Sequence, residues 1–260
     1  MLPGLPLFHR IAGRPVIVLG NGDAAMAKRR LVERAGGVVV DDLARGIDLG
    51  ARLAFIADDH IGDVAAARAA GLLVNVVDRP DLCDFTTPSL VDRAPVLIAV
   101  GTGGASAGLA KAVRLRIDAM LPQGLGALAD ALFAARGALR ARWPDAAARR
   151  RALDGALADG GALDPVRDHA ANAVAAWLGG AGSVAAGPVA AGRHVFDLTG
   201  DDPDDLTLRQ ARLLGQADAI VAPAHVPPAI LARARADALR LAPGEVEPDG
   251  LVVELRLPSP

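Results

Sequence analysis

A short glycine-rich segment near the start of the chain has the residue types needed to hold a diphosphate. It reads Gly20-Asn21-Gly22-Asp23-Ala24-Ala25, a G-x-G-x-x-A spacing, and it directly follows the apolar run 15–19. In such a turn the first glycine permits a tight bend, the second lets the backbone approach a pyrophosphate, and the alanine keeps the next helix close to the strand. The N–H groups that open this helix would then face the phosphates. The alternative interpretation is an ordinary glycine-rich turn between a strand and a helix.

Two adjacent carboxylates, Asp41 and Asp42, lie about twenty residues beyond the glycines, at the end of the apolar run 38–40. An acid at this place can accept hydrogen bonds from the ribose of an adenosine and repel a 2′-phosphate, which favours NAD over NADP. Arg45 follows closely and would oppose that preference. Two solvated acids in a turn are the alternative.

A third carboxylate, Asp78, ends the segment 75–77, which the pattern predicts to be the end of a strand. Ligands of open α/β sheets bind at the carboxyl ends of strands, so we expect Asp78 to point toward a cleft and to serve there as an acid or base. The alternative is a turn-forming aspartate before Arg79-Pro80.

Basic side chains that could bind an anionic substrate flank the last strand predicted in this part of the chain. Arg93 precedes that strand, and Lys111, Arg114 and Arg116 follow the glycine-rich turn after it. Guanidinium and ammonium groups bind carboxylates through charge-assisted hydrogen bonds, so these residues could form a basic wall. A solvated helix face is the alternative.

Composition excludes several other classes of function. The 28 Lys and Arg against 30 Asp and Glu give a net charge of -2, which argues against a dedicated nucleic-acid binder. One cysteine, Cys83, excludes a disulfide framework and a thiolate zinc cluster. The five histidines show neither i,i+4 pairing nor an HExxH motif, and Ser106 has no GxSxG context, so neither a metal site nor a hydrolase triad is expected.

Without a signal peptide or an apolar run near the roughly 18 residues of a membrane span, we expect a cytoplasmic protein with no membrane partner.

The elements that must position these residues alternate between strands and helices over residues 1–107. Strands are predicted at 15–19, 38–40, 53–57, 72–77 and 95–100, and helices at 24–35 and 64–70. This alternation indicates a Rossmann-like, doubly wound α/β domain with a parallel sheet.

The rest of the chain divides into three segments. Residues 108–178 are predicted to be helical, with helices at 109–120, 125–142 and 146–157, and 179–192 have the composition of a linker. Residues 193–260 are predicted to form a small α/β segment, with strands at 194–198 and 219–222 and helices at 206–214 and 228–241.

Taken together, these motifs resemble the N-terminal region of the siroheme synthase family, which combines precorrin-2 dehydrogenase and sirohydrochlorin ferrochelatase. The resemblance extends over residues 1–145 and weakens in the helical region. The segments that carry it, in order, are 5–8, 16–30, Asn75-Val76-Val77-Asp78, 85–93, 99–104 and 121–126.

The resemblance implies NAD-dependent oxidation of precorrin-2 to sirohydrochlorin, followed by insertion of ferrous iron to give siroheme. It implies that Asp78 is the acid/base carboxylate, and that NAD contacts the turn Gly22-Asp23-Ala24 and the loop Asp42 to Arg45, which includes Ala44. It also implies a homodimer joined through the segment after the Rossmann-like domain. A basic wall near Lys111 suits a tetrapyrrole substrate, because that substrate carries many carboxylates.

The chain departs from the family in three places. The family has a further strand and loop where this chain has only residues 42–52, between the strands predicted at 38–40 and 53–57. This shorter segment could alter the adenosine pocket or weaken cofactor binding. Gly101 replaces a serine that some members carry. The tail resembles the opening of the uroporphyrinogen-III methyltransferase domain, with an acidic turn at 200–205, and we interpret it as a truncated remnant without methyltransferase activity. Two alternatives therefore remain: a degenerate, non-catalytic tetrapyrrole- or nucleotide-binding protein, and a chelatase only.

Overall fold

The computed structural model describes residues 4–180 and 192–257, which divide into two compact units. The first unit comprises the residues up to Asp92 together with Leu97–Ala119, and the second comprises Arg93–Val96 and the residues from Met120 onward. Most of the linker predicted at 179–192 lies outside the described residues.

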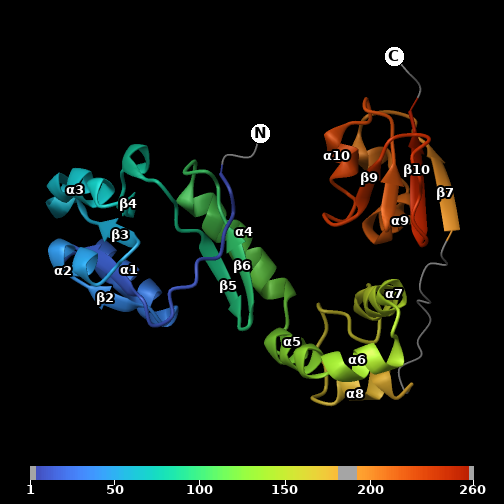
Figure 1. The fold of residues 1–260 in the computed structure, drawn as a ribbon, viewed down its shortest axis with the longest axis horizontal. Helices are drawn as coiled ribbons and strands as arrows, with labels where there is room; N and C mark the ends of the chain where they lie inside the picture. Colours follow the sequence, from blue (N-terminus) through green and yellow to red (C-terminus); the bar gives the residue numbers. More distant parts are fainter. Residues whose placement is uncertain (1–3, 181–191, 258–260) are drawn as a thin grey trace. The chain divides into compact units, whose positions relative to one another are not determined.

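The first unit is built on a four-stranded parallel sheet with the strand order β2-β1-β3-β4 (Figure 1). Its strands are β1 (Pro15–Leu19), β2 (Val38–Val40), β3 (Leu53–Ile56) and β4 (Leu73–Val76). Its helical elements are α1 (Asp23–Arg34), α2 (Leu43–Asp48), η1 (Asp58–Asp63), α3 (Val64–Ala69) and η2 (Pro80–Leu82). The predicted Rossmann-like parallel sheet is confirmed, and the chain changes direction between β1 and β3, where such folds bind ligands.

Both faces of this sheet are covered by helices, because successive residues of a strand point to opposite faces. Val16 and Val18 of β1 are buried in a cluster with Val32 of α1. Ile17 and Leu19 are buried in the opposite cluster, which includes Val64 and Ala67 of α3. The sheet is therefore doubly wound, as the sequence predicts.

The strand predicted at 95–100 is present as β6 (Val96–Val100), but it does not join the parallel sheet. It pairs with β5 (Ser89–Arg93), a strand that the sequence analysis leaves in a loop, to form a separate two-stranded sheet. Only Ala94 and Pro95 separate the two strands, so local pairing replaces the longer connection that a parallel neighbour would need. Helix α4 (Ala107–Met120) follows.

The second unit begins with the predicted helical region. Its helices are α5 (Leu125–Ala134), α6 (Arg136–Arg142), α7 (Ala146–Leu157) and α8 (Ala173–Leu178). Leu125, Leu128, Leu163 and Val174 form its buried core. The single helix predicted at 125–142 is interrupted at Ala135, and α8 is an additional helix.

A second parallel sheet, with the order β7-β10-β8-β9, confirms the predicted α/β character of the tail (Figure 1). Its elements are β7 (Gly192–Asp197), η3 (Pro203–Asp205), α9 (Leu208–Gln216), β8 (Ala219–Val221), α10 (Pro228–Leu231), β9 (Leu239–Leu241) and β10 (Leu251–Arg256). The helix predicted at 228–241 is wrong beyond Leu231. Its last three residues form β9, because Leu239 N–H donates to Asp218 and Leu241 accepts from Ala222, so tertiary pairing overrides helix propensity.

Candidate functional site

The four strands of the first unit deliver the candidate residues to one edge of the sheet. Gly20, Asp41 and Ala57 directly follow β1, β2 and β3, and Asp78 is two residues beyond the end of β4. Because all four strands are parallel, their carboxyl ends lie at the same edge. This is the edge at which open α/β sheets bind ligands.

The glycine turn has the geometry of an anion site. Gly20 adopts a φ of 107°, and a Cβ there would meet Ala57 Cβ at 2.5 Å and Asp59 Oδ1 at 2.8 Å, so the bend depends on glycine. Gly22 is the N-cap of α1, no side chain caps this helix, and a Cβ at Gly22 would meet nothing within 4 Å. Backbone N–H groups therefore open into free space at the positive end of a 12-residue helix.

The neighbouring residues of the turn leave this space accessible. Asn21, Asp23 and Ala24, the other members of the predicted contact set, are all exposed. Ala25 is buried, which lets α1 lie close to the sheet. The motif residues thus have the burial that a nucleotide turn requires.

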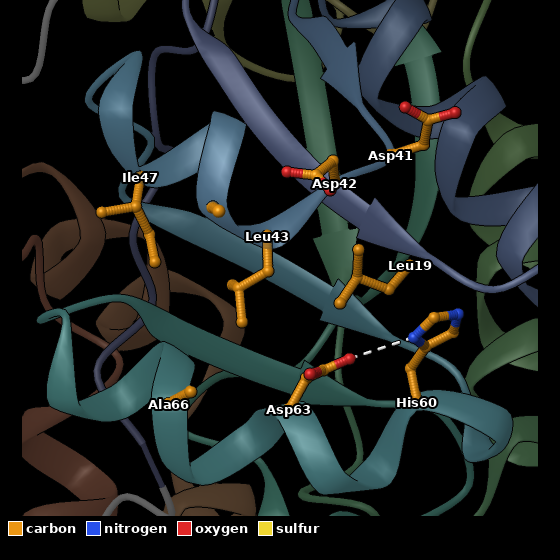
Figure 2. Close-up of a pocket in the computed structure, with 9 residues that line it drawn as sticks. Leu19, Asp41, Asp42, Leu43, Ile47, His60, Asp63 and Ala66 are labelled. Atoms are coloured by element: carbon orange, nitrogen blue, oxygen red, sulfur yellow. Dashed lines mark hydrogen bonds and ion pairs between the residues drawn. The ribbon is translucent and has the colours of Figure 1, made fainter.

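A cavity of about 500 Å³ lies at the ends of β1 and β2, beside this turn (Figure 2). It is lined by Leu19, Asp41, Asp42, Leu43, Ala44, Ile47, His60, Asp63 and Ala66. Three residues predicted to bind the cofactor, Asp41, Asp42 and Ala44, are among them, whereas Arg45, Asp78 and the glycine-turn residues 20–24 are not. The mixture of apolar walls and carboxylates suits a nucleoside, whose base is flat and whose ribose carries hydroxyl groups.

Asp42 has a structural task as well as a place in the cavity wall. Its Oδ1 accepts a hydrogen bond of 2.7 Å from Arg45 N–H and so caps α2, the helix that occupies the short segment 42–52. Gly46 lets α2 lie directly against Ile17 of β1, because a Cβ there would overlap that side chain. The carboxylates of Asp41 and Asp42 point in different directions (Figure 2), so the two acids do not act as one group.

His60 lies on the cavity wall beside a partner that the sequence analysis does not identify. His60 Nδ1 lies 3.0 Å from Asp63 Oδ2 across the lower wall of the cavity (Figure 2). Asp63 was missed, together with the apolar wall residues Leu19, Leu43, Ile47 and Ala66. Leu43 and Ile47 lie in α2, whereas Asp63 ends η1 and Ala66 lies in α3, so only the folded arrangement of these elements shows that they share a cavity.

Asp78 is exposed and adopts a φ of 56°, the left-handed region that few residues other than glycine occupy. Beneath it, the buried Asn75 donates 2.8 Å and 3.4 Å hydrogen bonds from Nδ2 to Phe85 O and Cys83 Sγ. Cys83 Sγ also accepts from Val76 N–H at 3.2 Å. These contacts fix the loop after β4, and thereby the turn that presents Asp78.

The basic residues predicted to bind substrate have different surroundings. Arg93 donates from Nε to Pro122 O at 3.2 Å and from Nη2 to Leu121 O at 3.3 Å, so its guanidinium anchors a neighbouring backbone segment. Arg114 Nη1 lies 3.5 Å from Asp118 Oδ2 on α4, and Lys111 is exposed on the same helix. Arg93 belongs to the second unit, and Lys111 and Arg114 belong to the first.

Within residues 4–180 and 192–257, no three His, Cys, Asp or Glu side chains gather as a set of metal ligands. Over the same residues, every helix is too short or too polar to cross a bilayer.

The doubly wound sheet and its glycine turn define a Rossmann-like unit. Residues 50–89 match a family model described as "Putative NAD(P)-binding". The chain is 38% identical to the siroheme synthase of Methylococcus capsulatus, over 93% of this chain and 57% of the relative. It is 35% identical to the siroheme synthase of Azotobacter vinelandii, over 93% of this chain and 58% of that relative. A solved structure titled "SirC, precorrin-2 dehydrogenase" aligns with a TM-score of 0.45 and 16% identity, over 60% of this chain and 90% of that one.

The chain is therefore homologous to the N-terminal part of siroheme synthases. It spans somewhat over half the length of the curated relatives it matches.

Proposed function

We propose that this chain is an NAD-dependent dehydrogenase that oxidises precorrin-2 to sirohydrochlorin. The observation that carries the proposal is the uncapped start of α1 at Gly22, open to free space at the carboxyl edge of the sheet. The homology to siroheme synthases supports the choice of substrate.

The residues would divide the work by position. N–H groups at 22–24 would hold the pyrophosphate, and Asp41 with Asp42 would hold the adenosine ribose in the adjoining cavity. NAD supplies the hydride acceptor when bound. Asp78 would accept the proton that leaves precorrin-2 in the same oxidation, so that the substrate loses one hydride and one proton. Lys111 and Arg114 of the first unit would bind the substrate carboxylates.

Insertion of ferrous iron into sirohydrochlorin is a second step that we include in the proposal, with iron as a substrate. Asp78 would accept pyrrole protons as two of them leave the macrocycle. The homodimer implied by the family resemblance is part of the same proposal.

One observation favours a second candidate function, a non-catalytic nucleotide- or tetrapyrrole-binding protein. Helix α2 replaces the longer segment expected between β2 and β3, and Asp42 is partly engaged as its cap. A chelatase without dehydrogenase activity is a third outcome, because metal insertion needs no nicotinamide.

Calorimetric titration of NAD into wild-type and Gly22→Asp protein tests the cofactor site. The new side chain enters open space, so the fold should persist while added bulk and charge weaken NAD binding at least about tenfold. Gly137→Asp is the matched control, because Gly137 lies in α6 of the second unit and is equally open. Equal NAD affinity in wild type and Gly22→Asp would reject the site.

The reaction itself is tested by incubating wild-type protein with precorrin-2 and NAD under anaerobic conditions. Growth of sirohydrochlorin absorption in step with NADH supports the dehydrogenase. Tight NAD binding without turnover favours the non-catalytic protein, and iron insertion without NAD binding favours the chelatase.

A further inference from the structure

The cavity at the ends of β1 and β2 has an apolar side formed by two helices. Leu43 and Ile47 are four residues apart and therefore lie on one face of α2, and Ala66 belongs to α3. Figure 2 shows Leu43 and Ile47 pointing from α2 toward the side of the cavity where Ala66 and Asp63 lie. Ile47 is exposed, so the folded unit by itself does not cover it. A flat aromatic ring placed between the two helices would cover these side chains.

The polar residues of the cavity offer acceptors rather than cations. The nine described residues that line it include no lysine or arginine, and three of them are the aspartates Asp41, Asp42 and Asp63. A ligand with hydroxyl and amino groups therefore suits this cavity better than a phosphate does. Asp41 and Asp42 lie on one side of the cavity, and Asp63 lies across it at the end of η1 (Figure 2).

The Asp63 carboxylate is held at one oxygen and open at the other. Its Oδ2 lies 3.0 Å from Nδ1 of His60, and because a carboxylate only accepts hydrogen bonds, the imidazole N–H is the donor. Asp63 is the N-cap of α3, but its side chain does not cap that helix. Among the residues that the structure describes, Asp63 Oδ1 has no hydrogen-bond partner, and the side chain is partly exposed. Oδ1 is therefore available to a donor on a ligand.

We propose that Asp63 selects adenine as the base of the bound dinucleotide: its Oδ1 accepts a hydrogen bond from the exocyclic amino group, and His60 holds the carboxylate in place. The adenine ring would lie between α2 and α3, with its ribose at Asp41 and Asp42. Hypoxanthine carries a carbonyl oxygen where adenine carries this amino group, so the carboxylate would face a second acceptor. The inference rests on the proposed function only for a dinucleotide at the glycine turn, and the choice of base requires no turnover.

Calorimetric titration with NAD and with nicotinamide hypoxanthine dinucleotide tests the choice of base. In the second compound a carbonyl oxygen replaces the amino group of the purine. Wild-type protein should bind NAD at least about tenfold more tightly, because the analogue leaves an acceptor facing an acceptor. In Asp63→Asn the side-chain amide can donate to the carbonyl oxygen as well as accept from the amino group, so the ratio of affinities should fall below about threefold.

Asp48→Asn is the matched control, since it makes the same change at an exposed residue of α2 that does not line the cavity, and should keep the wild-type ratio. Equal affinities for the two dinucleotides in the wild type would overturn the inference, and so would a wild-type ratio in Asp63→Asn. A purely structural role of Asp63 would weaken the binding of both dinucleotides alike and leave their ratio unchanged.

The positioning role of His60 is tested by the same ratio. His60→Ala removes the donor that holds Asp63 Oδ2, so the preference for NAD should fall at least about twofold. His60→Asn should retain most of the preference, because its amide nitrogen can take the place of Nδ1. An unchanged ratio in His60→Ala would show that Asp63 needs no help from His60.

The inference and the proposed function can fail separately. Wild-type protein that prefers NAD but does not oxidise precorrin-2 would support the choice of base and count against the dehydrogenase. Wild-type protein that oxidises precorrin-2 equally well with either dinucleotide, and binds both with the same affinity, would overturn the inference alone. Failure of both dinucleotides to bind would overturn the inference together with the proposed cofactor site.

Discussion

Asp78 occupies a backbone conformation that costs most side chains free energy, and this cost is consistent with a functional position. Its φ of 56° places the carboxylate just beyond β4, on a turn fixed by the buried Asn75 beneath it. Aspartate and asparagine tolerate the left-handed region better than other non-glycine residues. An asparagine at this position can therefore keep the turn while removing the charge.

We expect Asp78→Asn to bind NAD with wild-type affinity but to oxidise precorrin-2 about 100-fold more slowly or worse, because the proton acceptor is lost. Calorimetry and anaerobic absorption spectroscopy measure the two quantities. Asp81→Asn makes the same change three residues away and should retain turnover. An Asp78→Asn enzyme of wild-type rate would remove Asp78 from the mechanism.

Sequence spacing predicts the glycine turn because the conformation of such a turn depends on local backbone geometry. Gly20 and Gly22 need only their own turn and the adjoining helix. The contacts of Lys28 could not be predicted in this way, because its ammonium donates to Thr87 in the loop before β5 and lies over the Phe55 ring of β3. Only the fold brings together groups that are so distant in sequence.

At the scale of elements, α2 is the clearest departure from the expected pattern. The segment 42–52 is too short for another strand, and a six-residue helix capped by Asp42 fills it instead. An aspartate before a leucine is a helix-start signal, so this cap was available in the sequence. Asp42 therefore serves both the fold and the cavity, and two substitutions can separate these roles.

Asp42→Asn keeps a capping oxygen but removes the charge, so we expect unchanged stability and weaker discrimination against NADP. Asp42→Ala removes both, and should lower the free energy of unfolding by about 1 kcal/mol as well. Urea denaturation and parallel titrations with NAD and NADP measure these effects. Equal destabilisation by both variants would show that the charge, rather than the cap, supports α2.

Elements defined by long-range pairing were the least predictable. The run 228–241 is rich in alanine and leucine and predicts a helix, but its end is needed as strand β9 beside β8. The hairpin partner β5 and the strand β10 were likewise missed. Local propensity is a weak guide where a sheet neighbour determines the structure.

At the scale of the whole molecule, α4 presents apolar side chains that its own unit does not bury. Leu109 and Val113 are four residues apart on one face of α4, with exposed fractions of 56% and 37%, and only Ala110 of this helix is buried. Exposed apolar residues on one helix face are typical of an association surface. The helix follows the β5–β6 hairpin and belongs to the segment through which the proposed homodimer would be joined.

We therefore expect wild-type protein to have about twice the 26.5 kDa chain mass in light scattering coupled to size-exclusion chromatography. Val113→Arg places a charge in the expected apolar interface and should shift the population to the single-chain mass, because an unpaired buried charge is costly. Arg116→Glu alters an exposed polar position of the same helix and controls for changes in charge alone. A wild-type protein of single-chain mass over the micromolar range would contradict the dimer, and a dimeric Val113→Arg protein would place the interface on another surface.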